Sequence, residues 1–198
     1  MSRKCNSNLP RSISVADFIL EDNGHSIAEA AEEFKLARCT IERDINYLGS
    51  CAFYWCISLT EINLPNNLTT IRNNAFGSCR SLTSIKIPNT VTEIESAAFE
   101  GCTSLQSIKI PYGITTINQN TFSYCTELTD VEIPESVTSI YGGAFDRCYK
   151  LTNITIPSGV TWIDCNAFTS CKSLTRIIPI ITQLSGQSNQ FTQCRVLS

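Results

Sequence analysis

The sequence predicts an α+β fold: a right-handed solenoid of short strands and short helical turns spans residues 48–198 and follows a three-helix segment in residues 1–47. Three recurring residues predict the solenoid. A cysteine recurs at every 23rd position, with a phenylalanine three positions before it and a leucine three positions after it. The cysteines are Cys56, Cys79, Cys102, Cys125, Cys148, Cys171 and Cys194. A fixed period of this length is typical of stacked supersecondary units.

The N-terminal segment shows no strand alternation between residues 12 and 48, and its pattern predicts three helices. The first follows Ser12 and is broken at Asn23-Gly24. The second begins at Ser26, because Glu29 stands three residues later and completes a capping box. After a turn at residues 35–38, the third helix is expected to carry Thr40, Ile41, Arg43, Ile45 and Leu48.

The segment of residues 26–45, SIAEAAEEFKLARCTIERDI, resembles a bacterial helix-turn-helix of the stage III sporulation protein D type. This resemblance implies DNA contacts at the start of the third helix, made by Arg38, Cys39, Thr40 and Arg43. DNA binding of this kind predicts a homodimer, in which the contacts would be doubled. One functional hypothesis is therefore a DNA-binding transcriptional regulator in which the repeats sense or recruit a partner.

Charge and register favour a second interpretation of the same helices. Residues 1–50 hold six basic and eight acidic side chains, whereas DNA-docking modules cluster Lys and Arg on one face. Ile45 and Leu48 stand one repeat period before Leu68 and Ile71, so the segment enters the repeat phase without a linker. The alternative is that the helices only cap the open edge of the solenoid.

Each repeat is expected to contain a strand, a proline stop, a second extended piece and a short helical turn. Residues 85–87, 108–110 and 131–133 alternate apolar and polar side chains, which predicts strands with one buried face. Proline then ends each strand because it cannot donate to a ladder. The A-F-x-x-C motif places Phe and Cys on one face of a helical turn. After Leu174 the pattern becomes irregular, as expected of a terminal repeat.

The periodic cysteines are interpreted as small buried hydrophobic residues that fill one core layer. The alternative is that these cysteines are zinc ligands. Zinc ligation needs paired C-x₂₋₄-C spacing or histidines, and the chain has a single histidine, His25. One cysteine per repeat offers neither arrangement. No metal site and no cofactor are expected.

The complete unit, I-x-I-P-x-x-V-T-x-I-x-x-x-A-F-x-x-C-x-x-L, resembles the BspA-like leucine-rich repeats of bacterial proteins. The resemblance covers residues 48–198, and several independent positions recur in phase. It implies a leucine-rich-repeat solenoid that binds protein or matrix partners and has no catalytic residues.

The outward side of the repeats supplies the candidate protein-binding residues. On the strands these are Lys86, Lys109, Asp130 and Glu132. A second outward row is expected to contain Arg72, Glu95, Asn118, Tyr141 and Trp162. Tyr141 and Trp162 are singled out because exposed aromatic residues are typical binding hot spots. The alternative for either set is a merely solvated face.

Composition narrows the function classes further. The net charge of −3 does not suggest a polyanion partner. No signal-peptide pattern and no apolar run long enough to span a membrane occur, so a cytoplasmic protein with reduced thiols is expected. No G-x-S-x-G, phosphate-binding loop or H-E-x-x-H motif is present, so an enzyme is not expected. The primary hypothesis is a non-catalytic protein-binding solenoid.

Overall fold

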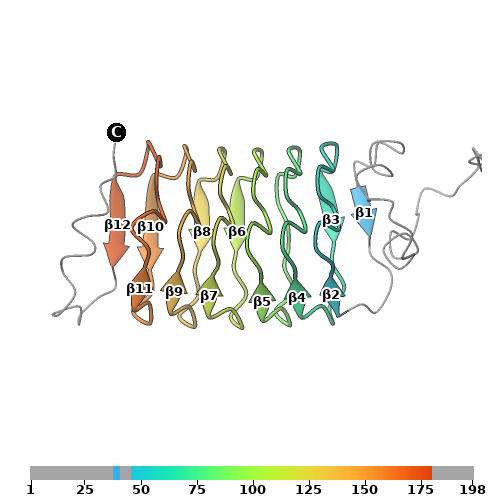
Figure 1. The fold of residues 1–198 in the computed structure, drawn as a ribbon, viewed down its shortest axis with the longest axis horizontal. Coiled ribbons are helices and arrows are strands. Elements are labelled where there is room, and N and C mark those ends of the chain that lie inside the picture. The colour runs from blue at the N-terminus through green and yellow to red at the C-terminus, as the bar shows by residue number, and fades with distance from the viewer. Residues whose placement is uncertain (1–37, 41–45, 180–198) are drawn as a thin grey trace, which may run out of the picture.

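A computed structural model describes residues 38–40 and 46–179, which coil into a solenoid whose turns stack along one long axis (Figure 1). Each turn contributes to two series of short strands. The first series is β1 (Arg38–Thr40), β3 (Glu61–Asn63), β6 (Ser107–Lys109), β8 (Asp130–Glu132), β10 (Asn153–Ile156) and β12 (Arg176–Pro179). The second series is β2 (Tyr47–Leu48), β4 (Thr70–Ile71), β5 (Glu93–Ile94), β7 (Thr116–Ile117), β9 (Ser139–Ile140) and β11 (Trp162–Ile163).

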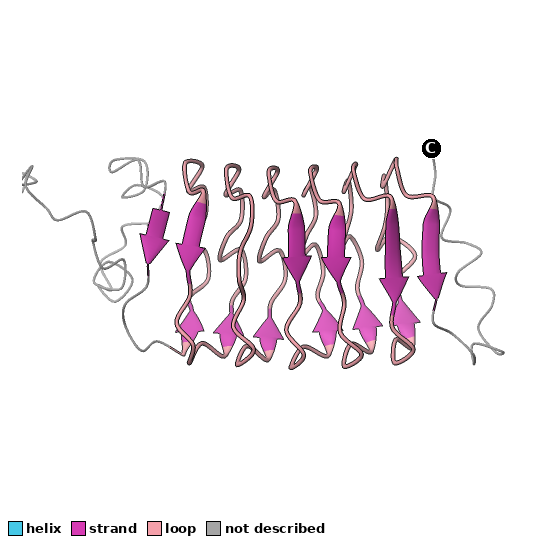
Figure 2. Cartoon of the chain, turned by 180° about the vertical axis from the view of Figure 1, so that it is seen from behind, coloured by secondary structure: helices cyan, strands magenta, loops and turns pink. Residues whose placement is uncertain are grey.

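All described strand pairs are parallel, and the sequence period sets their register. Lys109 pairs with Glu132 and Trp162 pairs with Ser139, each across one repeat period. The pairing is parallel because every turn returns the chain to the same place in the same direction, as the matching arrows of Figure 2 show. We call the outward surface of the first series the first face and that of the second series the second face.

The core consists of ladders in which one residue type repeats from turn to turn. The rings of Phe53, Phe76, Phe99, Phe122, Phe145 and Phe168 stack with centroids 5.2–5.5 Å apart. Neighbouring ring planes differ by 2–16°. One turn cannot bury its own apolar stripe, so this stacking is what makes the fold stable. The predicted solenoid core is confirmed.

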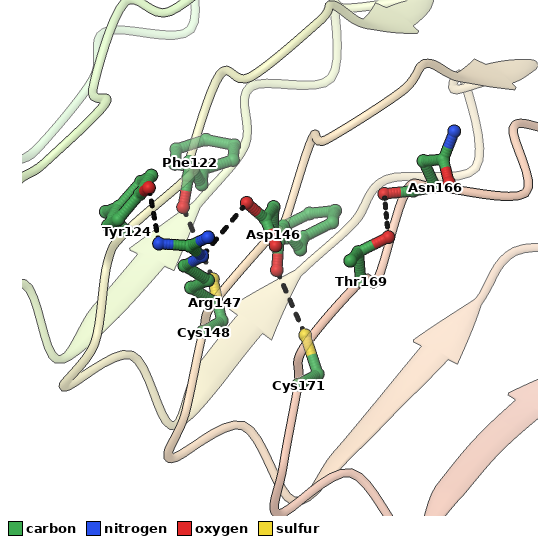
Figure 3. Close-up of polar contacts among 9 residues, drawn as sticks. Phe122, Tyr124, Asp146, Arg147, Cys148, Asn166, Thr169 and Cys171 are labelled. Atoms are coloured by element: carbon green, nitrogen blue, oxygen red, sulfur yellow. Dashed lines mark hydrogen bonds and ion pairs between the residues drawn. The ribbon is translucent and has the colours of Figure 1, made fainter. Parts of the chain in front are cut away.

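The cysteine ladder is buried and also forms hydrogen bonds. Each described periodic Cys from Cys79 onward donates its S–H to the carbonyl of the Phe 26 residues earlier, at 3.0–3.3 Å. Two of these bonds, from Cys148 to Phe122 and from Cys171, appear in Figure 3. Burial raises the pKa of Cys102 to about 12, so its thiol stays protonated. The prediction of buried structural thiols is confirmed, and the described residues hold no group of three or more potential metal ligands.

The A-F-x-x-C segment forms consecutive tight turns instead of the expected helical turn. In one repeat the N–H groups of Ala75, Gly77 and Cys79 donate to carbonyls three residues earlier. The intervening N–H groups, such as that of Phe76, donate to the next turn of the solenoid. Left-handed residues, two in most repeats, such as Asn74 (φ 54°) and Ser78 (φ 60°), reverse the backbone and prevent a helix from propagating. The part of the chain that the structure describes contains no helix, so the α+β prediction is wrong there.

The strand prediction holds for most repeats. Pro111 and Pro134 follow β6 and β8 closely, and each proline carbonyl accepts a bond from the residue three positions later. Residues 85–87 are the exception: Ile85 and Ile87 are buried and Lys86 is exposed, but no strand forms. The side chains there still alternate between buried and exposed, because this alternation depends on packing against the core and not on hydrogen bonds between strands.

Threonine hydroxyls add further bonds between neighbouring turns. Thr138 donates to the carbonyl of Thr115 at 3.2 Å, and Thr161 donates to that of Thr138 at 3.3 Å. A parallel row runs through Thr129 and Thr175. The hydroxyls thus satisfy backbone carbonyls along the edges of the stack.

The prediction of a third helix is wrong for those of its residues that the structure describes. Arg38–Thr40 form β1, which pairs with β3 in the register of the repeat, and Tyr47–Leu48 form β2, which pairs with β4. Repeat stacking overrides the helical pattern here because the same residues also fit the repeat phase. Residues 1–37 and 41–45, which include the first two predicted helices and Arg43, lie outside the described residues. Among the described residues no helix could cross a membrane.

The left-handed positions give a first testable prediction. We expect Gly143→Ala to lower the free energy of unfolding by about 1–3 kcal/mol, because its φ is +68° and a Cβ would clash with Asn120 Oδ1. Ser170 has a φ of 56°, so Ser170→Gly should instead raise it by up to about 1 kcal/mol. Urea denaturation of both variants checks the opposite signs. Equal effects of the two changes would contradict a role for backbone strain.

Candidate interaction surfaces

The first face carries the four charged residues predicted from the strand pattern. Lys86, Lys109, Asp130 and Glu132 are all exposed. Lys109 Nζ lies 2.6 Å from Glu132 Oε1, and both side chains are more than 60% exposed. These two charges therefore neutralise each other, and an exposed pair of this kind stabilises little. The structure brings the predicted residues onto one surface, while their role in binding stays a prediction.

The second face carries both predicted aromatic residues, but the expected single row is wrong. Trp162 pairs with Ser139, whereas Tyr141 lies two positions after Ser139, directly after the end of β9. The separation of the two aromatic positions is therefore two short of a full repeat period, so they lie diagonally on adjacent turns and in different rows. Tyr141 is 46% exposed and Trp162 is 42% exposed.

The N-terminal part of the second face is already occupied by intramolecular contacts. The guanidinium of Arg72 lies 4.6 Å from the centre of the Tyr47 ring. Asn73 donates to the Glu95 carboxylate at 2.6 Å. Among the described residues, Tyr141 and Trp162 have no such ring or cation contact. Their rings are therefore the uncovered aromatic surface of this face.

The turns form a third surface, on which cations cover aromatic rings. Arg80 lies 5.0 Å over Trp55, and Arg147 lies 4.6 Å over Tyr124. Figure 3 shows Arg147 reaching Tyr124, where its N–H also donates to the phenolic oxygen. Sequence reasoning missed these pairs, although Tyr124 and Arg147 are separated by exactly one repeat period. Each contact ties adjacent turns together and holds the ring in place.

Two hollows open on the same turn surface. The first is about 510 Å³ and is bordered by Tyr54, Arg80, Glu100, Gly101 and Tyr124. The second is about 470 Å³ and lies beside Tyr141, with Gly142 and Gly143 on its wall. Sequence analysis identified neither hollow. Each hollow forms where small residues of one turn lie between larger residues of neighbouring turns, and this arrangement is not visible within a single repeat.

Asp146 borders the second hollow and is incompletely paired. Its Oδ1 is buried without a hydrogen-bond partner, and its Oδ2 lies 3.6 Å from Arg147 Nε, as drawn in Figure 3. Burial raises the pKa of this carboxyl, while the neighbouring Arg147 guanidinium opposes that shift. Asp146 was not among the predicted site residues.

Three of the four predicted DNA-contacting residues lie in a strand and not in a recognition helix. Arg38, Cys39 and Thr40 are in β1, within the strand series of the solenoid. The single histidine, His25, and Arg43 lie outside the described residues.

Comparison with known proteins agrees with this architecture. A family model described as the BspA type leucine rich repeat region matches residues 25–148 and 94–198 in six copies. A leucine-rich repeat protein of T. pallidum is 33% identical, with a TM-score of 0.70, and the match covers 74% of this chain and 72% of that one. A leucine-rich repeat protein of Bacteroides ovatus is 31% identical, with a TM-score of 0.69, covering 72% of this chain.

A third structure, from Eubacterium ventriosum, is 24% identical with a TM-score of 0.59 over 78% of this chain, and it supports the fold alone. The chain spans 37% of the Bacteroides ovatus protein and 47% of the Eubacterium ventriosum protein. No curated protein is significantly similar to the chain.

Proposed function

The chain belongs to the BspA-type leucine-rich repeat family, and we propose that it is a non-catalytic protein-binding solenoid whose main contact is the second face around Tyr141 and Trp162. The observation that carries this proposal is the pair of uncovered rings on adjacent turns of a rigid stack. Tyr and Trp are enriched among residues that dominate binding energy. A stacked scaffold presents them with little further loss of conformational entropy on binding.

The surroundings of the two rings support the same assignment. The hollow beside Tyr141 gives the second face a concave edge, whereas in its N-terminal part the Tyr47 ring, although 46% exposed, already pairs with the Arg72 guanidinium. The first face offers the Lys109–Glu132 pair, whose charges already satisfy each other. A partner would therefore gain more from the C-terminal half of the second face.

DNA binding is not part of this proposal. The family model that matches from residue 25 treats the supposed helix-turn-helix as repeat sequence. Arg38, Cys39 and Thr40 form a strand of the solenoid, whereas that hypothesis required a recognition helix.

Affinity capture with matched variants tests the proposal. Extracts of the source cells are passed over the wild type, over Tyr141→Ser/Trp162→Ser, and over Lys86→Ser/Lys109→Ser, which changes the first face. We expect a partner that the wild type and the lysine variant retain. For the purified partner, calorimetry should show binding to the aromatic variant weakened by about 30-fold or more.

All four positions are exposed, so the variants should melt at the wild-type temperature. A partner that binds the aromatic variant with full affinity would contradict the assignment to the second face. Loss in the lysine variant alone would transfer the contact to the first face.

A further inference from the structure

The larger hollow, of about 510 Å³, interrupts a row of large side chains on the turn surface. This row contains the residue just before each described periodic Cys, namely Trp55, Ser78, Gly101, Tyr124, Arg147 and Ser170. All six have a positive φ between 56° and 72°, so the backbone is alike at every turn. In this row Ser78 and Gly101 occupy two consecutive turns, and both line the hollow together with Tyr124 of the next turn and Tyr54.

Tyr124 forms one rigid wall of the hollow. Arg147 of the following turn covers one side of its ring at 4.6 Å and donates a hydrogen bond to its hydroxyl. The other side of the Tyr124 ring faces the preceding turn, where the equivalent residue is Gly101, which has no side chain. Neighbouring core rings in this stack are 5.2–5.5 Å apart, so one turn provides room for one stacked ring. A ring above Gly101 would therefore stack on Tyr124.

Glu100 gives the hollow its polar specificity. Its side chain is partly buried, and its carboxylate forms no hydrogen bond or ion pair with any described residue. Burial raises the pKa of this carboxyl, consistent with a group that lacks a partner. Arg80 on the opposite wall is held over Trp55 and forms no ion pair with Glu100. The carboxylate of Glu100 is therefore free to accept a hydrogen bond from a donor placed in the hollow.

We infer that this hollow binds an aromatic side chain with a hydrogen-bond donor, a Trp or Tyr of a partner polypeptide. The ring stacks on Tyr124 above Gly101, and the indole N–H or phenolic O–H donates to the Glu100 carboxylate. Arg80 borders the hollow and Arg147 covers the far side of Tyr124, so two cations already lie near the Glu100 carboxylate and a neutral ring is preferred over a third. The inference rests on the proposed protein-binding function and adds a second anchor, on the turn surface, to the contact made by Tyr141 and Trp162.

The test titrates the full chain with three small probes while amide signals are followed by NMR. The probes are N-acetyl-tryptophanamide, N-acetyl-tyrosinamide and N-acetyl-phenylalaninamide, the last of which lacks the side-chain donor. We expect the first two to bind in the millimolar range and to shift signals near Ser78, Gly101 and Tyr124. Glu100→Gln should weaken both about tenfold and leave the phenylalanine probe unchanged. Glu93→Gln, on the second face, should change none of them.

A second variant tests the hollow without touching the carboxylate. Gly101→Tyr copies the residue found at position 124 and should abolish binding of the tryptophan probe. Ser170→Tyr places the same side chain in the same row, with a φ of 56°, and should leave it intact. Spectra and melting temperatures identify any variant that is not folded.

Equal binding of the three probes, binding that survives Gly101→Tyr in a folded protein, or no binding at all would each overturn the inference. The outcome is separate from that of the proposed function. Absence of probe binding together with loss of a partner in the Tyr141/Trp162 variant would leave the second-face assignment standing. If the probes bind but no such partner is found, the binding site in the hollow would be supported and the assignment of a partner to the second face would not.

Discussion

Phe99→Ala is expected to lower the free energy of unfolding by about 3–5 kcal/mol. Phe99 is completely buried and stacks on Phe76 and Phe122, with centroids 5.2 and 5.5 Å away. Its removal leaves a cavity between two turns that the rigid stack cannot close, and it breaks contacts on both sides. Urea denaturation followed by circular dichroism measures the loss.

Phe168→Ala is the matched control for this prediction. Phe168 is 7% exposed and, among the described residues, stacks only on Phe145. Nearest-neighbour coupling between repeats therefore predicts a smaller loss at position 168 than at position 99. A larger loss at position 168 would contradict the ladder as the main source of stability.

The second large effect is a loss of stability at alkaline pH. Burial raises the pKa of Cys102 to about 12 and raises that of Cys125 well above its ordinary value. In the unfolded chain both thiols titrate near pH 8.5, so above that pH the unfolded state binds fewer protons than the native state. Stability is therefore fully present below about pH 8.5 and falls toward pH 12. Each thiol contributes a slope of about 1.4 kcal/mol per pH unit, or about 3 for the two.

Urea denaturation in reducing buffer from pH 7.5 to 10.5 measures this slope. The control is Cys102→Ala/Cys125→Ala, which is less stable at neutral pH because it contains cavities. Its stability should nevertheless fall less steeply above pH 9, by about 3 kcal/mol per pH unit. Parallel curves for the two proteins would show that the buried thiols are not responsible. Lysine and tyrosine ionisation affects both proteins equally and cancels in the comparison.

The sequence alone predicted the repeat, the core and the inward cysteines. This was possible because the same residue types recur in phase seven times along the sequence, so the repeat does not depend on a chance match at one turn. The residues of the first face were also placed correctly, since side chains alternate along an extended segment. The same logic failed for Tyr141 and Trp162, whose separation falls two positions short of the repeat period and puts them in different rows.

The site features that only the structure shows depend on neighbours in other turns. The hollow at Gly101 exists because Ser78 and Gly101 are small while Tyr124 follows them in the stack. The contact of Arg147 with Tyr124 needs both side chains to project from equivalent turns. A single repeat carries no information about such combinations.

By itself, the sequence determined the periodic stack, its buried ladders and its family, because burial selects the same residue type at every turn. Only the tertiary structure decided that the A-F-x-x-C segments are not helical and that Arg38–Thr40 join the strands. The reason is the same in both places. Alternate N–H groups of each turn find acceptors in the next turn, and parallel pairing fixes the register, so contacts between turns outweigh the local preference for a helix.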